Sequence, residues 1–133
     1  MGSRETPAIP VSWGELIDKI TILEIKSARL PELAARGNVL KELSMLQAIA
    51  NPVVGNDTTI EALKAELRAV NLSLWGIEDH IREKEVQQAF DAEFIALARS
   101  VYFQNDHRAT LKKQLNMALK SELVEEKSYK KYS

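Results

Sequence analysis

The stretch IEALKAELRAVNLSLWGIEDHI (residues 60–81) decides the fold class, because its apolar residues follow a helical rhythm. Leucine, isoleucine and valine recur at alternating steps of three and four residues, at positions 60, 63, 67, 70, 74, 77 and 81. This spacing places them on one stripe of an α-helix, the pattern of a helix packed against an antiparallel or coiled neighbour. The helix is predicted to begin at Asp57 or Thr58, with Glu61 completing a capping box.

The apolar rhythm stops after Ile81, where positions 84, 85 and 88 are Lys, Glu and Gln. A new apolar seam begins at Phe90 and continues through positions 94, 97 and 101. The nine-residue interval between the two seams fits neither a seven- nor an eleven-residue repeat. We therefore predict a break near residues 84–90 and a further helix from about Asp91 towards Leu119. The alternative is a single helix of about 60 residues, roughly 90 Å long.

The first half of the chain contains two further helical segments. Residues 1–11 contain two prolines and are expected to form an extended arm. Ser12 and Glu15 form a second capping box, which opens a helix that ends or kinks at Pro31 and Gly37. Asn38 is predicted to cap a short second helix, which the turn-forming sequence NPVVGND (residues 51–57) ends.

These segments predict an all-α protein, an antiparallel bundle of about four helices with a C-terminal tail laid across it. Residues 1–11 are the arm, and residues 12–133 form a single helical domain. The chain has 133 residues, of which 45% are hydrophobic and 28% charged, and no alternating β pattern extends over more than a few residues. These values are ordinary for one globular domain.

Composition and motifs exclude several functions. The net charge of −1 gives no reason to expect nucleic acid binding, and the absence of cysteine excludes disulfides and thiolate chemistry. No apolar run is long enough to cross a membrane, and the first ten residues, MGSRETPAIP, lack the apolar segment of a signal peptide. We therefore expect a cytoplasmic protein. No zinc-peptidase, phosphate-loop or nucleophile-elbow motif occurs, so we expect neither a cofactor nor a metal.

A polar stripe runs along the helix that contains residues 71–85. Asn71, Trp75, Glu78 and Arg82 fall within about 60° of one another, roughly a quarter-turn from the apolar seam. On the following helix, the seam is interrupted by three polar residues at positions 105, 108 and 112. A guanidinium in an apolar seam needs a carboxylate or an anionic ligand, because burying it unpaired costs several kcal/mol, on the order of 3–5.

Two interpretations of this stripe are open. In the first, Glu78 and Arg108 form a structural ion pair, which the amides of Asn71 and Asn105 bridge. In the second, the stripe lines a pocket for a small polar or anionic ligand, formed by Asn71, Trp75, Glu78, Arg82, Asn105, Arg108 and Lys112. In the first helix, Asp18 and Arg29 share a face with two isoleucines, and we interpret these charges as exposed i,i+4 partners.

Four blocks of the sequence carry a resemblance: VSWGELIDKITILEIK, VNLSLWGIEDHIREKE, FDAEFIALARSVYFQNDHRATLKKQLN and SELVEEKSY. With these blocks the chain resembles a family of small uncharacterised bacterial all-helical proteins, over roughly residues 11–132. The resemblance implies a bacterial origin and an association with glycosyltransferases, and it carries no activity. A second helical family of unknown function is similar at Asn71, Leu74, Trp75, Glu78, Asp79, Arg82, Asn105, Asp106 and Arg108.

The leading hypothesis for function is an accessory or binding domain whose polar cluster holds a small anionic or glycan-related ligand. We expect a homodimer, formed through an apolar face that the first or third helix leaves uncovered. The alternative is a small all-helical enzyme of chorismate-mutase style. In that enzyme Arg82, Arg108 and Lys112 would hold an anionic metabolite, with Glu78 as their polar partner and Arg29 as a possible further cation.

Overall fold

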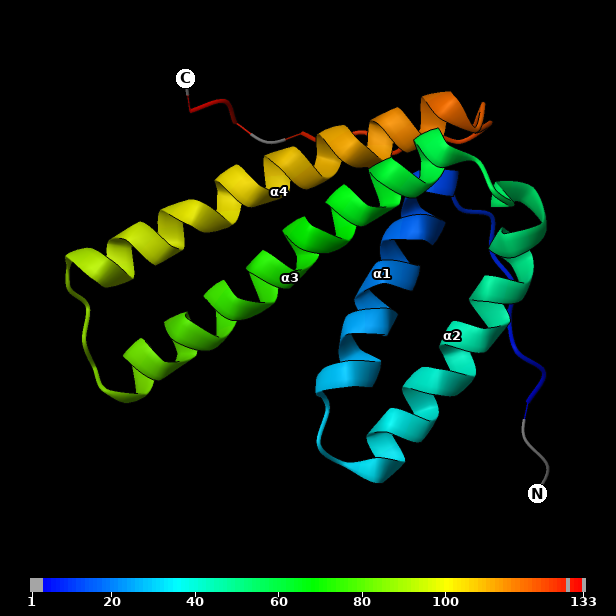
Figure 1. The fold of residues 1–133 in the computed structure, drawn as a ribbon. Helices are drawn as coiled ribbons and strands as arrows, with labels where there is room; N and C mark the ends of the chain where they lie inside the picture. Colours follow the sequence, from blue (N-terminus) through cyan, green and yellow to red (C-terminus); the bar gives the residue numbers. More distant parts are fainter. Residues whose placement is uncertain (1–3, 129, 133) are drawn as a thin grey trace.

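The computed structural model describes residues 4–128 and 130–132, and within them the chain forms four α-helices and no strand. The helices are α1 (Trp13–Arg29), α2 (Leu33–Val54), α3 (Thr58–Val86) and α4 (Ala92–Ala118). Figure 1 shows two helical hairpins, α1–α2 and α3–α4, which meet at one end and diverge at the other. The predicted all-α antiparallel fold is therefore confirmed.

The predicted starts of α1, α3 and α4 are also confirmed. The Ser12 hydroxyl accepts a hydrogen bond from the Glu15 backbone N–H at 3.1 Å, and an Asp57 carboxylate oxygen accepts from Thr59 and Ile60. A break separates α3 from α4, as predicted, so the alternative of one continuous helix is wrong. At this break Gln88 adopts a left-handed φ of 56°, and the Lys84 ammonium lies 3.0 Å from Asp91.

The prediction for the second helix is wrong at its start and in its length. Helix α2 begins at Leu33 rather than after Asn38, spans 22 residues, and includes Pro52. Pro52 lies in the last turn, where it lacks the backbone N–H that would donate to the carbonyl four residues earlier. The helix ends at Gly55, whose φ of 53° lies in the left-handed region that glycine adopts without strain.

The hydrophobic core lies where the two hairpins meet. Its most deeply buried members are Ile17, Ile20, Ile60, Leu67, Leu111 and Leu115. The outer half of the α3–α4 hairpin, residues 72–110, contains no fully buried residue. Leu74, Ile77 and Ile81, which the sequence pattern places in a buried seam, are only half-buried. Helix α1 crosses the hairpin near its open end, away from the α3–α4 turn, so between the crossing and the turn α3 and α4 pack only against each other.

The C-terminal segment turns back along α4, as predicted. The Ser121 backbone N–H donates to the Asn116 carbonyl at 2.7 Å, which reverses the chain direction just after the helix. Further on, the Tyr132 hydroxyl donates to Asp106 at 2.6 Å, and its ring lies 5.0 Å from that of Tyr102. At the other terminus, residues 4–11 form no helix or strand. Residues 1–3 of the predicted arm lie outside the described residues.

We predict opposite effects for two helical glycines. A Cβ at Gly14 would overlap the Lys112 carbonyl oxygen across the α1–α4 contact, whereas a Cβ at Gly76 meets open space. Gly14→Ala should therefore lower the free energy of unfolding by about 1–3 kcal/mol. Gly76→Ala should raise it by roughly 0.5–1 kcal/mol, because alanine restricts the unfolded chain and favours the helix. Urea denaturation measures both values, and a neutral Gly14→Ala would contradict the close approach of α1 to α4.

Candidate functional site

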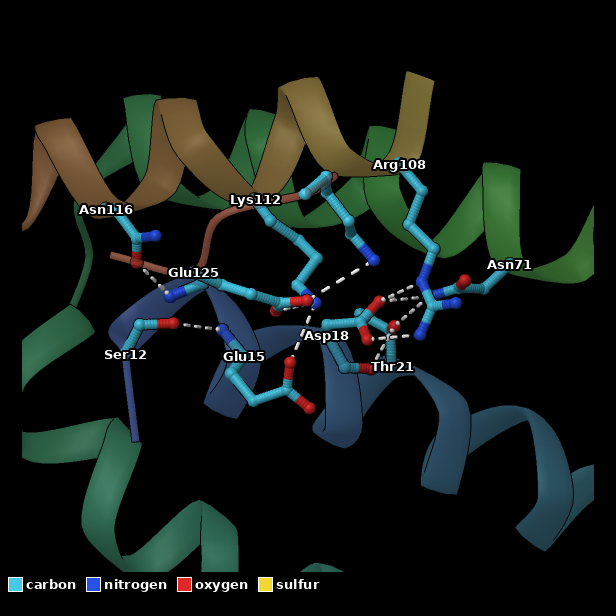
Figure 2. Close-up of polar contacts among 11 residues, drawn as sticks. Ser12, Glu15, Asp18, Thr21, Asn71, Arg108, Lys112, Asn116 and Glu125 are labelled. Carbon is cyan, nitrogen blue, oxygen red and sulfur yellow. Dashed lines mark hydrogen bonds and ion pairs between the residues drawn. The ribbon is translucent and has the colours of Figure 1, made fainter. Parts of the chain in front are cut away.

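A buried carboxylate marks the point where α1 crosses the α3–α4 hairpin (Figure 2). The side chain of Asp18 is 1% exposed and accepts hydrogen bonds from Nε of Arg108 at 2.9 Å and from Nη2 at 2.6 Å. The Asn71 amide nitrogen donates to the same carboxylate at 2.9 Å and to the Thr21 hydroxyl at 2.9 Å. The bidentate Arg–Asp contact is the strongest form of such a pair and joins α1 to α4, while the Asn71 hydrogen bonds join α1 to α3.

The predicted Glu78–Arg108 pair is wrong. Arg108 pairs with Asp18, while Glu78 accepts a hydrogen bond from Arg82, one turn along the same helix, at 2.9 Å. The prediction of an exposed Asp18 is wrong for the same reason. Helix α1 lies across the hairpin and inserts its own carboxylate between α3 and α4, a contact that helical periodicity cannot reveal.

A second ion pair lies one turn further along α4. The Lys112 side chain is 9% exposed, and its ammonium lies 2.7 Å from Glu15 and 2.8 Å from Glu125. Beside it, the Gly14 backbone N–H donates to the Asn116 side-chain oxygen at 2.6 Å. Lys112 therefore connects α1, α4 and the C-terminal segment, and Figure 2 shows its side chain between the two carboxylates.

The pKa values of these groups reflect their partners. Hydrogen bonds to Asp18 raise the pKa of Arg108 further above its ordinary value, against the opposing effect of burial. Burial acts to lower the pKa of Lys112, but hydrogen bonds to Glu125 and Glu15 outweigh it, so the pKa is raised. The Lys112 ammonium in turn lowers the pKa of Glu125 to about 2. Both cations therefore stay charged at neutral pH.

A cavity of about 390 Å³ opens beside the Asp18–Arg108 pair, between α1 and the diverging hairpin. We call it the fork pocket. Its lining residues are Ile22, Ile25, Asn71, Leu74, Trp75, Glu78, Asp79, Val101, Asn105 and Arg108. Five of the seven predicted ligand-binding residues lie together here: Asn71, Trp75, Glu78, Asn105 and Arg108. The other two do not line the cavity, because Arg82 is exposed beside Glu78 and Lys112 is held by its two carboxylates.

The chemistry of the fork pocket is polar and slightly acidic. Arg108, the one cation among the described lining residues, is paired with Asp18, and Glu78 is paired with the exposed Arg82. Asp79 is the lining acid without an ion pair in the described part of the chain. Within the described part of the chain, the Trp75 indole N–H and the Asn105 amide form no hydrogen bond. The pocket can therefore offer a flat apolar ring, an amide and carboxylate acceptors to a ligand.

Sequence reasoning did not identify three residues of the site: Glu15, Asp18 and Glu125. A signal for Asp18 was present, because it shares a helical face with Ile22 and Ile25. An acid on an otherwise apolar face requires a cationic partner if that face is buried. For Glu15 and Glu125 no signal existed, since Glu15 reaches Lys112 only through the crossing of α1 and α4, and Glu125 only when the C-terminal segment folds back.

Two other classes of site find no support among the described residues. Within residues 4–128 and 130–132, no group of three or more acidic, histidine or cysteine side chains is arranged to hold a metal ion. His80 and His107 are exposed, and His107 lies 3.4 Å from Glu66. No helix in these residues has the length and apolar character needed to cross a membrane.

The fold and these polar contacts define an all-helical domain in which the buried Asp18 connects α1 to Arg108 of α4 and to Asn71 of α3. Residues 8–132 match a family model described as a family of unknown function (DUF6165), and the chain belongs to this family. No curated protein and no solved structure matches the chain. The predicted membership of an uncharacterised family is confirmed, and the family description carries no activity.

A double-mutant cycle tests the buried pair. Arg108→Met leaves the Asp18 carboxylate buried without its cation and should cost about 3–5 kcal/mol of unfolding free energy. Asp18→Leu should be destabilising for the converse reason, and the double variant should lose less than the sum of the two. Glu78→Gln is the control, because its exposed pair with Arg82 should contribute under about 1 kcal/mol. Losses that add within roughly 0.5 kcal/mol would contradict a direct Asp18–Arg108 interaction.

Acid should weaken the attachment of the C-terminal segment. The folded pKa of Glu125 is about 2, below its ordinary value of 4.5, so its ion pair contributes stability above pH 4.5. That contribution is lost as the pH falls from 4.5 towards the folded pKa of about 2. The difference in unfolding free energy between the native chain and Glu125→Gln should be constant above pH 6 and shrink on acidification. A difference that grew towards low pH would have the wrong sign.

Proposed function

We propose that this protein is a helical binding module whose fork pocket holds a neutral, polyhydroxylated group such as a sugar unit. The observation that carries the proposal is the meeting of Trp75, Asn105 and the carboxylates of Glu78 and Asp79 in one cavity. A sugar ring has an apolar face of C–H groups and an edge of hydroxyl groups. An aromatic ring suits the face, while amides and carboxylates accept and donate hydrogen bonds at the edge.

The size of the fork pocket is consistent with a ligand of this kind. Its volume of about 390 Å³ lies at the lower end of the roughly 300–1,000 Å³ typical of small-molecule sites. Ile22 and Ile25 contribute an apolar wall from α1, opposite the polar side chains of α3 and α4. A single sugar unit, or the end of a longer glycan, fits such a cavity better than a large cofactor does.

The charges favour a neutral ligand over an anionic one. Arg108 is paired with Asp18 and Glu78 with Arg82, so an anion would meet the carboxylate of Asp79 and no free cation among the described lining residues. The same pairing weighs against an enzyme of chorismate-mutase style. The cations needed to hold its substrate are engaged elsewhere: Arg82 with Glu78, and Lys112 with Glu15 and Glu125. Arg29 lines a different cavity, beside Lys64 and Arg68.

A module that holds a sugar acts by presenting it to another protein. We therefore keep a glycosyltransferase of a bacterial cytoplasm as the proposed partner, in line with the association that the sequence resemblance implies. In that arrangement the domain contributes substrate positioning, while the partner contributes the chemistry of glycosyl transfer. This assignment leaves the module without a catalytic residue of its own.

Binding of neutral saccharides tests the proposed function. Saturation-transfer NMR with a panel of neutral mono- and disaccharides should identify at least one ligand, and titration calorimetry then measures its affinity. Trp75→Ala should weaken binding about tenfold or more, since losing the stacked ring removes on the order of 1.4 kcal/mol. Trp75→Phe retains a smaller ring and should bind with intermediate affinity.

Leu40→Ala, on the exposed surface of α2, serves as the control variant and should bind like the native chain. Unchanged affinity in Trp75→Ala would disprove the site. A preference for phosphorylated over neutral saccharides that Arg108→Met abolishes would show instead that the pocket recognises anions.

A further inference from the structure

Helix α2 has an exposed apolar stripe that no described part of the chain covers. One face of α2 packs on α1 through Val39, Leu43 and Ala50. Met45, Ile49 and Val53 lie at successive four-residue steps on another face, where 46%, 58% and 53% of their surfaces are exposed. Residues four apart form one ridge of a helix, which is the element that packs into the groove of a second helix.

The C-terminal half of α2, which carries this stripe, is uncharged. The last twelve residues of α2, LSMLQAIANPVV (residues 43–54), contain no acidic or basic side chain. A surface helix normally carries charged residues on its outer face, and a helix that is apolar on several sides is normally buried. The outer face of α2 therefore has the composition of an interface rather than that of a solvent-exposed surface.

A second copy of the chain is the occupant that fits this face. An uncharged surface meets its own copy without repulsion, and a two-fold axis brings identical ridges together. The tip of the α3–α4 hairpin also exposes apolar residues, including Val86 and Phe90, but its charges oppose self-association. Residues 78–93 contain six acids and two bases, a net charge of −4, so two tips would repel each other.

We propose that α2 packs against α2 of a second copy around a two-fold axis, with the Met45–Ile49–Val53 stripe at its centre. The two α1–α2 hairpins then form a four-helix bundle, and both α3–α4 hairpins project away from it. This proposal places the dimer contact on α2, whereas the sequence pattern suggests the first or third helix. The fork pocket lies on the other side of α1, so the dimer leaves it open to ligands.

Sedimentation velocity over micromolar concentrations tests the proposal. The native chain should sediment as a dimer of about twice 15.0 kDa, and Ile49→Glu should sediment as a folded monomer of 15.0 kDa. A buried, unpaired carboxylate at the centre of the contact should weaken dimerisation at least a hundredfold. The matched control is Ile95→Glu on α4, because Ile95 is 56% exposed, close to the value for Ile49. This variant should remain dimeric.

Circular dichroism establishes that each variant is helical before its mass is interpreted. If Ile49→Glu loses its helicity, Val53→Glu replaces it, because Val53 is also half exposed on the same stripe. A native monomer across the concentration range would overturn the proposal. So would a dimer that persists in folded Ile49→Glu or Val53→Glu, or one that Ile95→Glu dissociates, which would assign the contact to the α3–α4 hairpin.

Discussion

The contact between Asp18 and Arg108 is the constraint on which the rest of the structure depends. A carboxylate buried in an apolar core is tolerated only with a cation and hydrogen-bond donors around it. Arg108 of α4 and Asn71 of α3 supply them, so both helices must approach α1 at this one point. The close approach at Gly14 and the Lys112 ion pairs follow one turn away on the same crossing.

The crossing also explains why a pocket exists where it does. Helix α1 holds the α3–α4 hairpin near its open end and then leaves it, so the two hairpins diverge beyond the ion pair. The gap is lined by Trp75 and Asn105, which a third packed helix would otherwise cover. Because Asp18 neutralises the charge of Arg108, the pocket offers polar groups to a ligand but little electrostatic attraction to an anion. Its charge balance is therefore a consequence of how the fold is held together.

The apolar surfaces of α2 and of the α3–α4 hairpin tip lie outside the core, and their charges distinguish them. The C-terminal half of α2 is uncharged and suits contact with an identical face, whereas the hairpin tip is apolar but acidic. Electrostatics affects the choice of partner more strongly than apolar area does. The α1–α2 hairpin is thereby suited to self-association, while the α3–α4 hairpin extends into solvent with the fork pocket near its base.

The sequence by itself determined the helices, most of their boundaries and the break between α3 and α4, because periodicity and capping are local properties. It also selected five residues that line the fork pocket, since Asn71, Trp75 and Glu78 share one helical face, as do Asn105 and Arg108 on the next helix. Only the tertiary structure decided that Arg108 pairs with Asp18 and Lys112 with Glu125. Those partners lie 90 and 13 residues apart in sequence, and the crossing of α1 and the reversal of the chain after α4 bring them together.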